Sequence, residues 1–245
     1  MAKTIKKKMV AGDIIYGVHP VVELLKQKRR KVLDVFMLNP EPKIWMELRD
    51  MLPKYPVRIH KMSKESLNQR LGTTDHQGIG AFAQQFPFRK KFFEPKKQPF
   101  LLLLDGVQDV RNFGAIVRSA YCTGVNGIII CRRKGAPLRG ASLKASAGLV
   151  ERMEIYETSS VGNAIQELKD AGYNLYVAAL SKKANAFTIQ YKKPLCLIIG
   201  SEGTGVSSLA LKSGTVVTLP QKSTDVSYNA SVAAGILLSV ISQQS

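Results

Sequence analysis

The 245-residue chain lacks any apolar run near the roughly 18 to 20 residues that a membrane-spanning helix needs. Its first residues, 1 to 8, are basic, and no apolar stretch follows them, so the pattern of an export signal is missing as well. We therefore expect a soluble, cytoplasmic protein without a membrane partner.

Cysteine is scarce. The chain has three, Cys122, Cys131 and Cys196, and none of them belongs to a Cys-x-x-Cys pair. An odd number of cysteines in apolar surroundings argues against a disulfide framework, and this spacing does not indicate a metal site. We expect three buried, reduced thiols, as in cytoplasmic proteins, and no metal.

Histidine is equally scarce, and two nucleotide-binding motifs are missing. The three histidines, His19, His60 and His76, are scattered, and we expect each to be structural or exposed instead of a general base. The chain contains neither a Gly-x-Gly-x-x-Gly turn nor a Gly-Lys-Ser/Thr phosphate loop. These absences argue against a dinucleotide-binding fold and a P-loop nucleotidase.

Positive charge is abundant. The 36 lysines and arginines exceed the 18 acidic residues, which gives a formal net charge of +18. Such an excess favours a polyanionic partner, because lysine and arginine displace counterions from phosphates. RNA, DNA and an anionic membrane all remain open on charge alone. The excess is +12 over residues 1–100 and +6 over 101–245, so the first part is the stronger candidate for binding.

A segment rich in proline, phenylalanine and basic residues divides the chain. Residues 86–100 contain three prolines, five phenylalanines and five basic residues, which is typical of a linker. The phenylalanines either stack on unpaired bases or dock the linker onto the domains, and docking is the favoured interpretation. We predict a first domain at 11–84, a linker at 85–99 and a second domain at 100–245.

The first domain has the pattern of a small α/β unit. A helix begins near Pro20, and the apolar stretches Val32–Leu38 and Val57–His60 are strand-like and flank a helix at Ile44–Met51. Ser63 is a good N-cap for a further helix. This part of the sequence contains no catalytic constellation.

The second domain alternates apolar strands with helical patterns, which predicts a mainly parallel sheet covered on both faces. One helix follows Ser160 and ends at Gly172, and the last begins at about Ala230. The expected strands are Phe100–Leu104, Gly127–Cys131, Met153–Tyr156, Leu175–Leu180, Leu195–Ile199 and Thr215–Leu219.

Three loops that follow strands are candidates for a site, because open parallel sheets bind ligands beyond the carboxyl ends of their strands. In the first loop, Asn112 is either a helix cap or a site residue, and Arg118 is either a solvated arginine or a site residue. Gly114 in the same loop permits close approach of another backbone. The second, Gly200–Gly205, has three glycines, and Glu202 can accept hydrogen bonds there.

The third loop leads into the last helix. Ser227 and Asn229 are natural N-caps, and capping alone would explain them. The small residues from Ala230 to Gly235 allow close helix packing and suit a subunit interface.

The order of the three loops is more specific than any one of them. Asp-x-x-Asn-x-Gly-Ala-x-x-Arg, Gly-Ser-Glu-Gly-x-Gly and Ser-x-Asn-x-Ser-Val-Ala-Ala resemble the three motifs of the SpoU family of RNA ribose 2′-O-methyltransferases, of the SPOUT class. The resemblance covers residues 100–245. Two further stretches, 16–20 and 76–79, resemble the substrate-binding domain of the ribosomal RNA branch, whose bacterial member methylates a guanosine of 23S ribosomal RNA.

The resemblance implies a fold, a methyl donor and partners. The second domain is expected to contain a deep trefoil knot that binds S-adenosylmethionine, the first to be similar to ribosomal protein L30e, and the protein to be a homodimer that acts on RNA. Family members usually carry leucine where Tyr228 stands. The implied cofactor-binding residues are Leu180, Ile199, Gly200, Gly205, Leu219 and Tyr228.

The implied catalytic residues are Asn112, Arg118, Glu202, Ser227 and Asn229. By analogy with the family, Arg118 is the base, assisted by an RNA phosphate or by a partner subunit. A guanidinium is a poor proton acceptor. The other role open to Arg118 is therefore to stabilise the forming alkoxide. A transfer RNA 2′-O-methyltransferase and a non-catalytic RNA-binding or ribosome-assembly protein on the same scaffold are the alternative functions.

Overall fold

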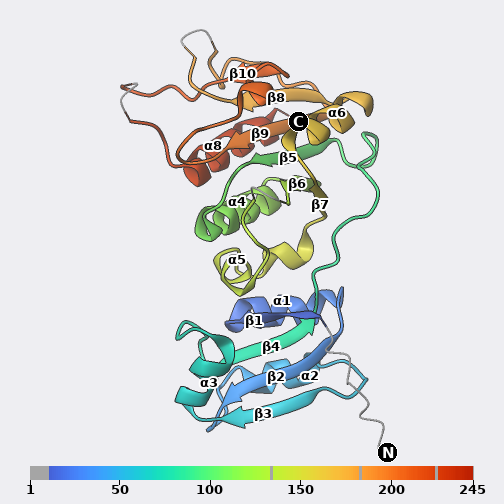
Figure 1. Ribbon diagram of the computed structural model, residues 1–245, viewed down its shortest axis with the longest axis vertical. Helices are drawn as coiled ribbons and strands as arrows, with labels where there is room; N and C mark the ends of the chain where they lie inside the picture. Colours follow the sequence, from blue (N-terminus) through green and yellow to red (C-terminus); the bar gives the residue numbers. More distant parts are fainter. Residues whose placement is uncertain (1–10, 133–134, 182–183, 224–225, 245) are drawn as a thin grey trace, which may run out of the picture. The chain divides into compact units, whose positions relative to one another are not determined.

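The computed structural model describes residues 11–132, 135–181, 184–223 and 226–244. The chain forms two compact units: unit 1 ends at Pro87 and unit 2 begins at Phe88 (Figure 1). Within the described ranges, no helix has the length and apolar character needed to span a lipid bilayer.

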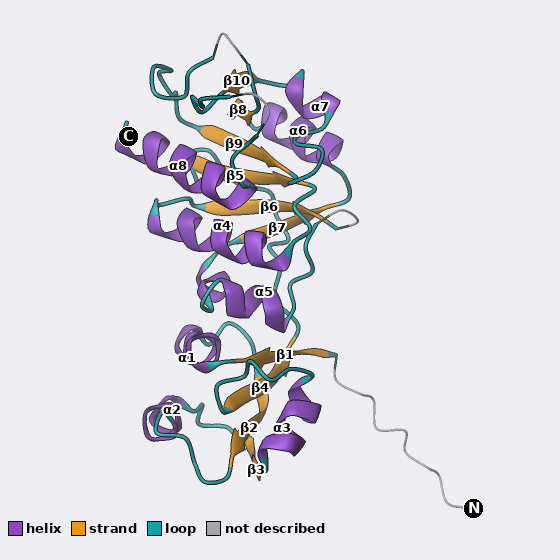
Figure 2. Ribbon diagram, turned by 90° about the vertical axis from the view of Figure 1, so that its left-hand side faces the viewer, coloured by secondary structure: helices purple, strands orange, loops and turns teal. Residues whose placement is uncertain are grey.

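Unit 1 is a four-stranded mixed sheet in the order β1-β4-β2-β3. Strand β4 is antiparallel to both β1 and β2, whereas β2 and β3 are parallel. Helix α3 lies on one face of the sheet, and α1 and α2 lie on the other (Figure 2). The elements are β1 (Gly12–Tyr16), α1 (Val18–Gln27), β2 (Val32–Leu38), α2 (Trp45–Met51), β3 (Arg58–Met62), α3 (Lys64–Leu71) and β4 (Ile79–Gln84).

The predicted small α/β unit is confirmed, including its local signals. Ser63 is the N-cap of α3, because its Oγ accepts a hydrogen bond from the backbone N–H of Ser66 (3.3 Å). Strand β3 runs two residues beyond the predicted end at His60. The sequence pattern did not locate β1 or β4, since each is short and contains a glycine, which weakens the strand signal.

Unit 2 is a six-stranded sheet in the order β10-β8-β9-β5-β6-β7, and every strand pairing among its described residues is parallel. Its strands are β5 (Phe100–Asp105), β6 (Gly127–Cys131), β7 (Ile155–Thr158), β8 (Asn174–Ala178), β9 (Leu195–Gly200) and β10 (Thr215–Val217). Its helices are α4 (Val110–Cys122), α5 (Gly140–Ala145), the 3₁₀ helix Leu149–Arg152, α6 (Val161–Asp170), α7 (Ser208–Leu211) and α8 (Ala230–Gln243).

The core of unit 2 lies on both faces of this sheet. Strands β5 and β9 are neighbours near its centre, and all their residues are buried. Helices α4 and α8 cover one face, and α6 and α7 cover the other (Figure 2). The predicted α/β fold with a parallel sheet between helices is therefore confirmed.

Two predicted strands extended too far because apolar residues continue past the ends of the paired segments. Strand β8 ends at Ala178, and Leu180 follows as a loop residue; β10 ends at Val217, before Leu219. Both leucines line a cavity, so their apolar character serves that wall and not the sheet. Strand β7 begins two residues later than predicted, since a 3₁₀ helix occupies Leu149–Arg152.

One cysteine prediction was wrong. Cys131 and Cys196 are buried, but Cys122 is exposed. It is the last residue of α4, whose buried side runs through Phe113, Val117 and Ala120, so position 122 points outward.

The phenylalanines between the two sheets dock onto the units that adjoin them, which confirms the favoured interpretation for those that are buried. Phe86 is buried in unit 1, and Phe93 and Phe100 are buried in unit 2. Phe92 packs edge-on against Tyr156.

Candidate active site

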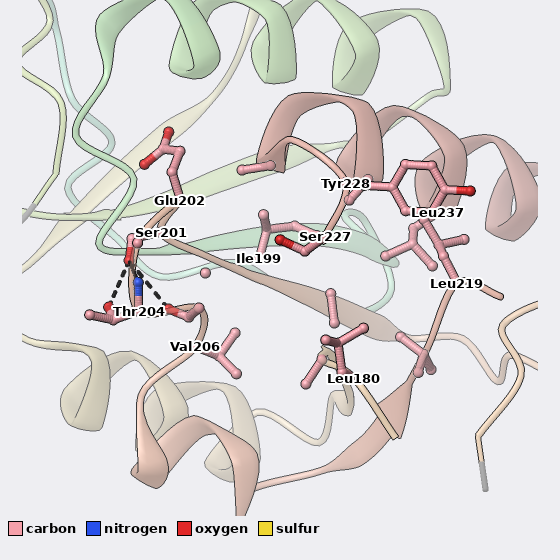
Figure 3. Close-up of a pocket in the computed structure, with 18 of the residues that line it drawn as sticks. Leu180, Ile199, Ser201, Glu202, Thr204, Val206, Leu219, Ser227, Tyr228 and Leu237 are labelled. Carbon is pink, nitrogen blue, oxygen red and sulfur yellow. Dashed lines mark hydrogen bonds between the residues drawn. The ribbon is translucent and has the colours of Figure 1, made fainter. Parts of the chain in front are cut away.

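A cavity of about 420 Å³ lies beyond the carboxyl ends of β8, β9 and β10 (Figure 3). Apolar side chains from several elements form its walls, among them Leu180, Ile199, Leu219 and Leu237. Glu202 stands at one end and Tyr228 at the other (Figure 3). The predicted residues in its lining are Leu180, Ile199, Gly200, Gly205, Leu219 and Tyr228 from the cofactor-binding set, and Glu202 and Ser227 from the catalytic set.

The loop after β9 closes on itself and supplies part of the wall. Ser201 and Gly205 exchange two backbone hydrogen bonds of 3.0 Å, and the hydroxyls of Ser201 and Thr204 are 2.8 Å apart (Figure 3). Gly205 has a φ of +66°, which favours glycine. A Cβ at Gly200 would overlap the backbone of Gly205. Gly200 and Gly205 are therefore required by a tight turn whose backbone faces the cavity.

Asn112 joins the first loop to the second. Its Nδ2 donates a 2.6 Å hydrogen bond to Oε1 of Glu202, 90 residues later in the chain. The N-cap of α4 is Asp109, whose Oδ1 accepts from the backbone N–H of Arg111 (2.7 Å), so capping does not explain Asn112. The hydrogen bond from the Arg111 side chain also holds the pKa of Asp109 below its usual range.

Asn229, unlike Asn112, is a helix cap. It is the N-cap of α8, and its Oδ1 accepts hydrogen bonds from the backbone N–H (2.9 Å) and the hydroxyl (2.7 Å) of Ser231. Ser227 lines the cavity and does not cap the helix. Asn229 is outside the lining, although it directly follows Tyr228, which lies within it.

Arg118 is not brought into the cavity by the fold of a single chain. It is exposed on α4, it is absent from the lining, and it makes no hydrogen bond or ion pair with the part of the chain that the structure describes. Within the same described ranges, no group of three or more His, Cys, Asp or Glu side chains is arranged to hold a metal ion.

Asp105 is a residue near the site that the sequence analysis did not single out. It ends β5, pairs with Gly200 of β9 and is only 6% exposed. Its Oδ2 accepts a 2.7 Å hydrogen bond from the backbone N–H of Ser207 and so anchors the segment that follows the glycine loop. The available signal was a carboxylate at the end of an otherwise apolar strand.

Two family models match the chain. The model of the SpoU rRNA methylase family matches residues 99–239, and a model described as RNA 2′-O ribose methyltransferase substrate binding matches residues 14–89. The first match covers more than half of the chain and includes all three motif loops.

Whole-chain relatives are similar to it as well. The putative TrmH family tRNA/rRNA methyltransferase YacO of Bacillus subtilis is 30% identical over 92% of this chain and 93% of its own. The 23S rRNA (guanosine-2′-O-)-methyltransferase RlmB of Shewanella oneidensis is 28% identical over 94% of this chain and 96% of its own.

A solved structure has the same fold. The SpoU methyltransferase AviRb of Streptomyces viridochromogenes, in complex with the cofactor AdoMet, aligns with a TM-score of 0.79 at 19% identity, over 96% of this chain and 90% of that one.

Proposed function

The chain belongs to the SpoU rRNA methylase family, and we propose that it is an RNA 2′-O-ribose methyltransferase that uses S-adenosylmethionine as the methyl donor. The observation that carries this proposal is the hydrogen bond between Asn112 and Glu202 beside the cavity. It joins the first and second sequence motifs at the carboxyl edge of a parallel sheet, where such folds bind ligands.

The cavity fits the methyl donor in volume and polarity. Its volume of about 420 Å³ lies within the roughly 300 to 1,000 Å³ usual for small-molecule sites. The walls formed by Leu180, Leu219 and Leu237 suit a flat adenine ring, which Tyr228 covers from one end. The Glu202 carboxylate at the other end suits a positively charged sulfur. When bound there, S-adenosylmethionine supplies a methyl group that a hydroxyl oxygen can attack.

The polar residues of the site position the ribose. Asn112 donates to one oxygen of Glu202, which leaves Oδ1 of Asn112 and Oε2 of Glu202 as acceptors for the ribose hydroxyls. Two acceptors fixed by one hydrogen bond would orient a bound ribose before the reaction, and orientation of this kind supplies much of an enzyme's rate enhancement. Ser227 lies between them and Tyr228 along the wall, where it can hydrogen-bond the sugar or the donor.

The 2′-hydroxyl must lose its proton, and unit 2 has no histidine for that task. We assign Arg118 to the electrostatic stabilisation of the forming alkoxide, with an RNA phosphate nearby as the proton acceptor. Arg118 lies outside the cavity lining of its own chain, and we propose that it reaches the site of a second copy across a subunit interface.

A homodimer through α8 would provide that interface. Helix α8 has no charged residue, and Val232, Ile236 and Val240 form an apolar stripe at i, i+4 and i+8 that is partly exposed. Val232 alone is 48% exposed. An apolar stripe of this kind is typical of a surface that a second copy of the chain covers.

The substrate is proposed to be a guanosine of 23S ribosomal RNA. The activity named for the RlmB relative, together with the match of residues 14–89 to a substrate-binding model, supports ribosomal RNA. The name of the YacO relative includes transfer RNA, which is the nearest alternative.

The chain path is part of the same proposal. A deep trefoil knot in unit 2 is proposed from the resemblance to the SpoU family, whose model matches residues 99–239. An L30e-like fold for unit 1 is supported by its mixed sheet with helices on both faces. A crystal structure that traces residues 195–244 without threading them through a loop would reject the knot.

The test is methyl transfer from radiolabelled S-adenosylmethionine to 23S ribosomal RNA and to transfer RNA, followed by digestion to nucleosides. The expected product is 2′-O-methylguanosine from ribosomal RNA. Label in transfer RNA instead would identify the alternative substrate. No label in either RNA, together with no heat of binding to S-adenosylmethionine in calorimetry, would show a non-catalytic protein.

A further inference from the structure

Unit 1 contains a polar cluster that the proposed chemistry does not use. Asp34 lies on β2 with its side chain only 5% exposed, yet it accepts a 2.7 Å hydrogen bond from Nη2 of Arg58 and forms a 2.8 Å hydrogen bond with Nε2 of His60. Both partners are on β3, the edge strand of the sheet. The hydrogen bonds to Arg58 and His60 keep the pKa of Asp34 below its usual value, even though desolvation acts in the opposite direction.

The same contacts fix an exposed aromatic ring. The His60 imidazole stacks on Phe36 with ring centres 5.1 Å apart and 24° between the planes, and its side chain is still 40% exposed. Phe36 covers one face of the His60 imidazole, and Nε2 is hydrogen-bonded to Asp34. The exposed part of the imidazole is therefore its opposite face and the edge away from Nε2. Orienting a ring in advance lowers the conformational entropy that a ligand must offset when it binds.

Two guanidinium groups contact the residues that hold this ring, Arg58 at Asp34 and Arg70 at Phe36. The side chain of Arg58 is 69% exposed. Arg70, on the last turn of α3, is exposed and lies 4.6 Å from the centre of Phe36. Among the residues that the structure describes, Asp34 is the carboxylate that pairs with this group, and it is buried and engaged by two partners. The solvent side of the cluster therefore presents positive charge beside an aromatic face.

We propose that Arg58, His60 and Arg70, which we call the β3 surface, bind an unpaired nucleotide of the RNA substrate. The base would stack on the imidazole, and the phosphates next to it would pair with the two guanidinium groups. Stacking platforms between cationic side chains are the usual means of holding single-stranded nucleic acid. This inference rests on the proposed function, since it identifies the face of unit 1 that contacts the substrate.

A purely structural role is the competing explanation. Charged residues on an edge strand prevent pairing with other chains, and Arg58 and His60 also satisfy a buried carboxylate. That role needs the hydrogen bond from His60 but not its aromatic ring. His60→Gln separates the two, because its amide can still donate to Asp34 and has no ring to stack.

The test is fluorescence anisotropy of the full chain with a short labelled single-stranded RNA and with a duplex of the same sequence. We expect Arg58→Ala, Arg70→Ala and His60→Gln each to weaken single-strand binding about fivefold or more, and His60→Tyr to restore it. Arg58→Ala should also lower the slope of log Kd against log salt by about 0.7, the loss of one phosphate contact. Arg49→Ala and Lys26→Ala, exposed residues of the same unit, should bind like the unaltered protein.

Two results would overturn the β3 surface. One is a folded His60→Gln protein, with an unchanged melting temperature, that binds single-stranded RNA as tightly as the unaltered chain. The other is an equal loss in the Arg49 and Lys26 controls. The methyl-transfer assay of the unaltered protein separates the two proposals: transfer with normal binding by the variants rejects the surface alone, whereas no transfer rejects the enzyme.

Discussion

Asn112 and Glu202 behave as one unit in the structure, because a single hydrogen bond links two loops that are far apart in sequence. We expect Asn112→Ala and Glu202→Ala each to lower kcat/KM about 100-fold, the order of loss that follows from a misplaced reacting group. The double variant should be no more than a few-fold worse than either single one, since the pair is already broken.

The matched control is Asn163→Ala, an exposed asparagine of α6 outside the cavity lining. It should retain full activity. Losses that multiply in the double variant would mean that Asn112 and Glu202 act separately.

Gly200 and Gly203 lie in one loop but differ in the space around them. A Cβ at Gly200 would overlap the backbone of Gly205, whereas one at Gly203 would meet nothing within 4 Å. Gly200→Ala should therefore deform the turn and weaken S-adenosylmethionine binding at least about tenfold, while Gly203→Ala leaves it unchanged. Calorimetric titration of both variants with S-adenosylmethionine provides the comparison. Equal affinities would show that the loop is not part of the binding site.

Among the secondary-structure elements, the contact of α4 with α5 depends on Gly114. A Cβ there would overlap Ala145, and it would lie 2.7 Å from the backbone N of Ser146, which cannot move aside as a side chain can. Gly114→Ala should lower the free energy of unfolding by about 1 to 3 kcal/mol. The closeness predicted from the sequence at this glycine is thus confirmed as a helix-helix contact.

Gly162 on α6 is the control for that change. Its Cβ would meet the end of the Leu209 side chain, which is 54% exposed and can move, and Oγ of Ser160 at an ordinary contact distance of 3.8 Å. Gly162→Ala should leave stability unchanged or raise it by up to about 1 kcal/mol, because alanine favours helix. Urea unfolding of both variants measures the difference, and equal destabilisation would show that close packing at Gly114 is not the cause.

On the scale of the whole molecule, the buried Tyr173 and the half-buried Tyr191 make the stability of unit 2 sensitive to alkaline pH. Burial raises the pKa of Tyr173 and of Tyr191 to about 12, and their hydroxyls donate to the carbonyls of Gln98 (2.8 Å) and Ala186 (3.0 Å). The unfolded chain releases these protons near pH 10, so stability is complete below about pH 10 and falls as pH rises towards 12.

Chemical denaturation at a series of pH values measures this loss. Tyr173→Phe should show a shallower decline above pH 10 than the unaltered protein, whereas Tyr228→Phe, an exposed tyrosine, should not. Identical slopes for Tyr173→Phe and the unaltered chain would contradict the assignment.

The proposed homodimer makes a prediction about mass and about activity. Light scattering should give about twice the 27.0 kDa of one chain, and Val232→Glu should give a monomer.

If Arg118 acts across the interface, mixing inactive Arg118→Ala with inactive Glu202→Ala should restore about a quarter of the activity, because half of the dimers then hold one intact site. If the mixture regains no activity, Arg118 and Glu202 of one chain contribute to the same site.

The net charge of unit 1 is smaller than the +12 of residues 1–100 suggests. Residues 11–87 hold twelve basic and eight acidic side chains, so their excess is small, and much of the remainder lies in residues 1–10 and 88–100. An RNA-binding role for unit 1 therefore depends on where its charges lie, as at the β3 surface, more than on their sum.

The sequence by itself determined the features that neighbouring residues control. Apolar runs located β5, β6 and β9 within a residue, and Ser63 and Ser160 begin helices as caps do. The order of three short motifs was enough to identify the family, because each motif is contiguous in the chain.

Tertiary structure alone decided which of these residues meet. Placing β9 beside β5 sets Gly200 opposite Asp105 and so brings Glu202 to Asn112, and no local pattern encodes a pairing between segments about ninety residues apart. The same holds for Arg118, which the motif includes but the cavity of its own chain does not. Local propensity acts over a few residues, whereas a site is formed by the packing of distant strands, and that packing is fixed only when the whole sheet forms.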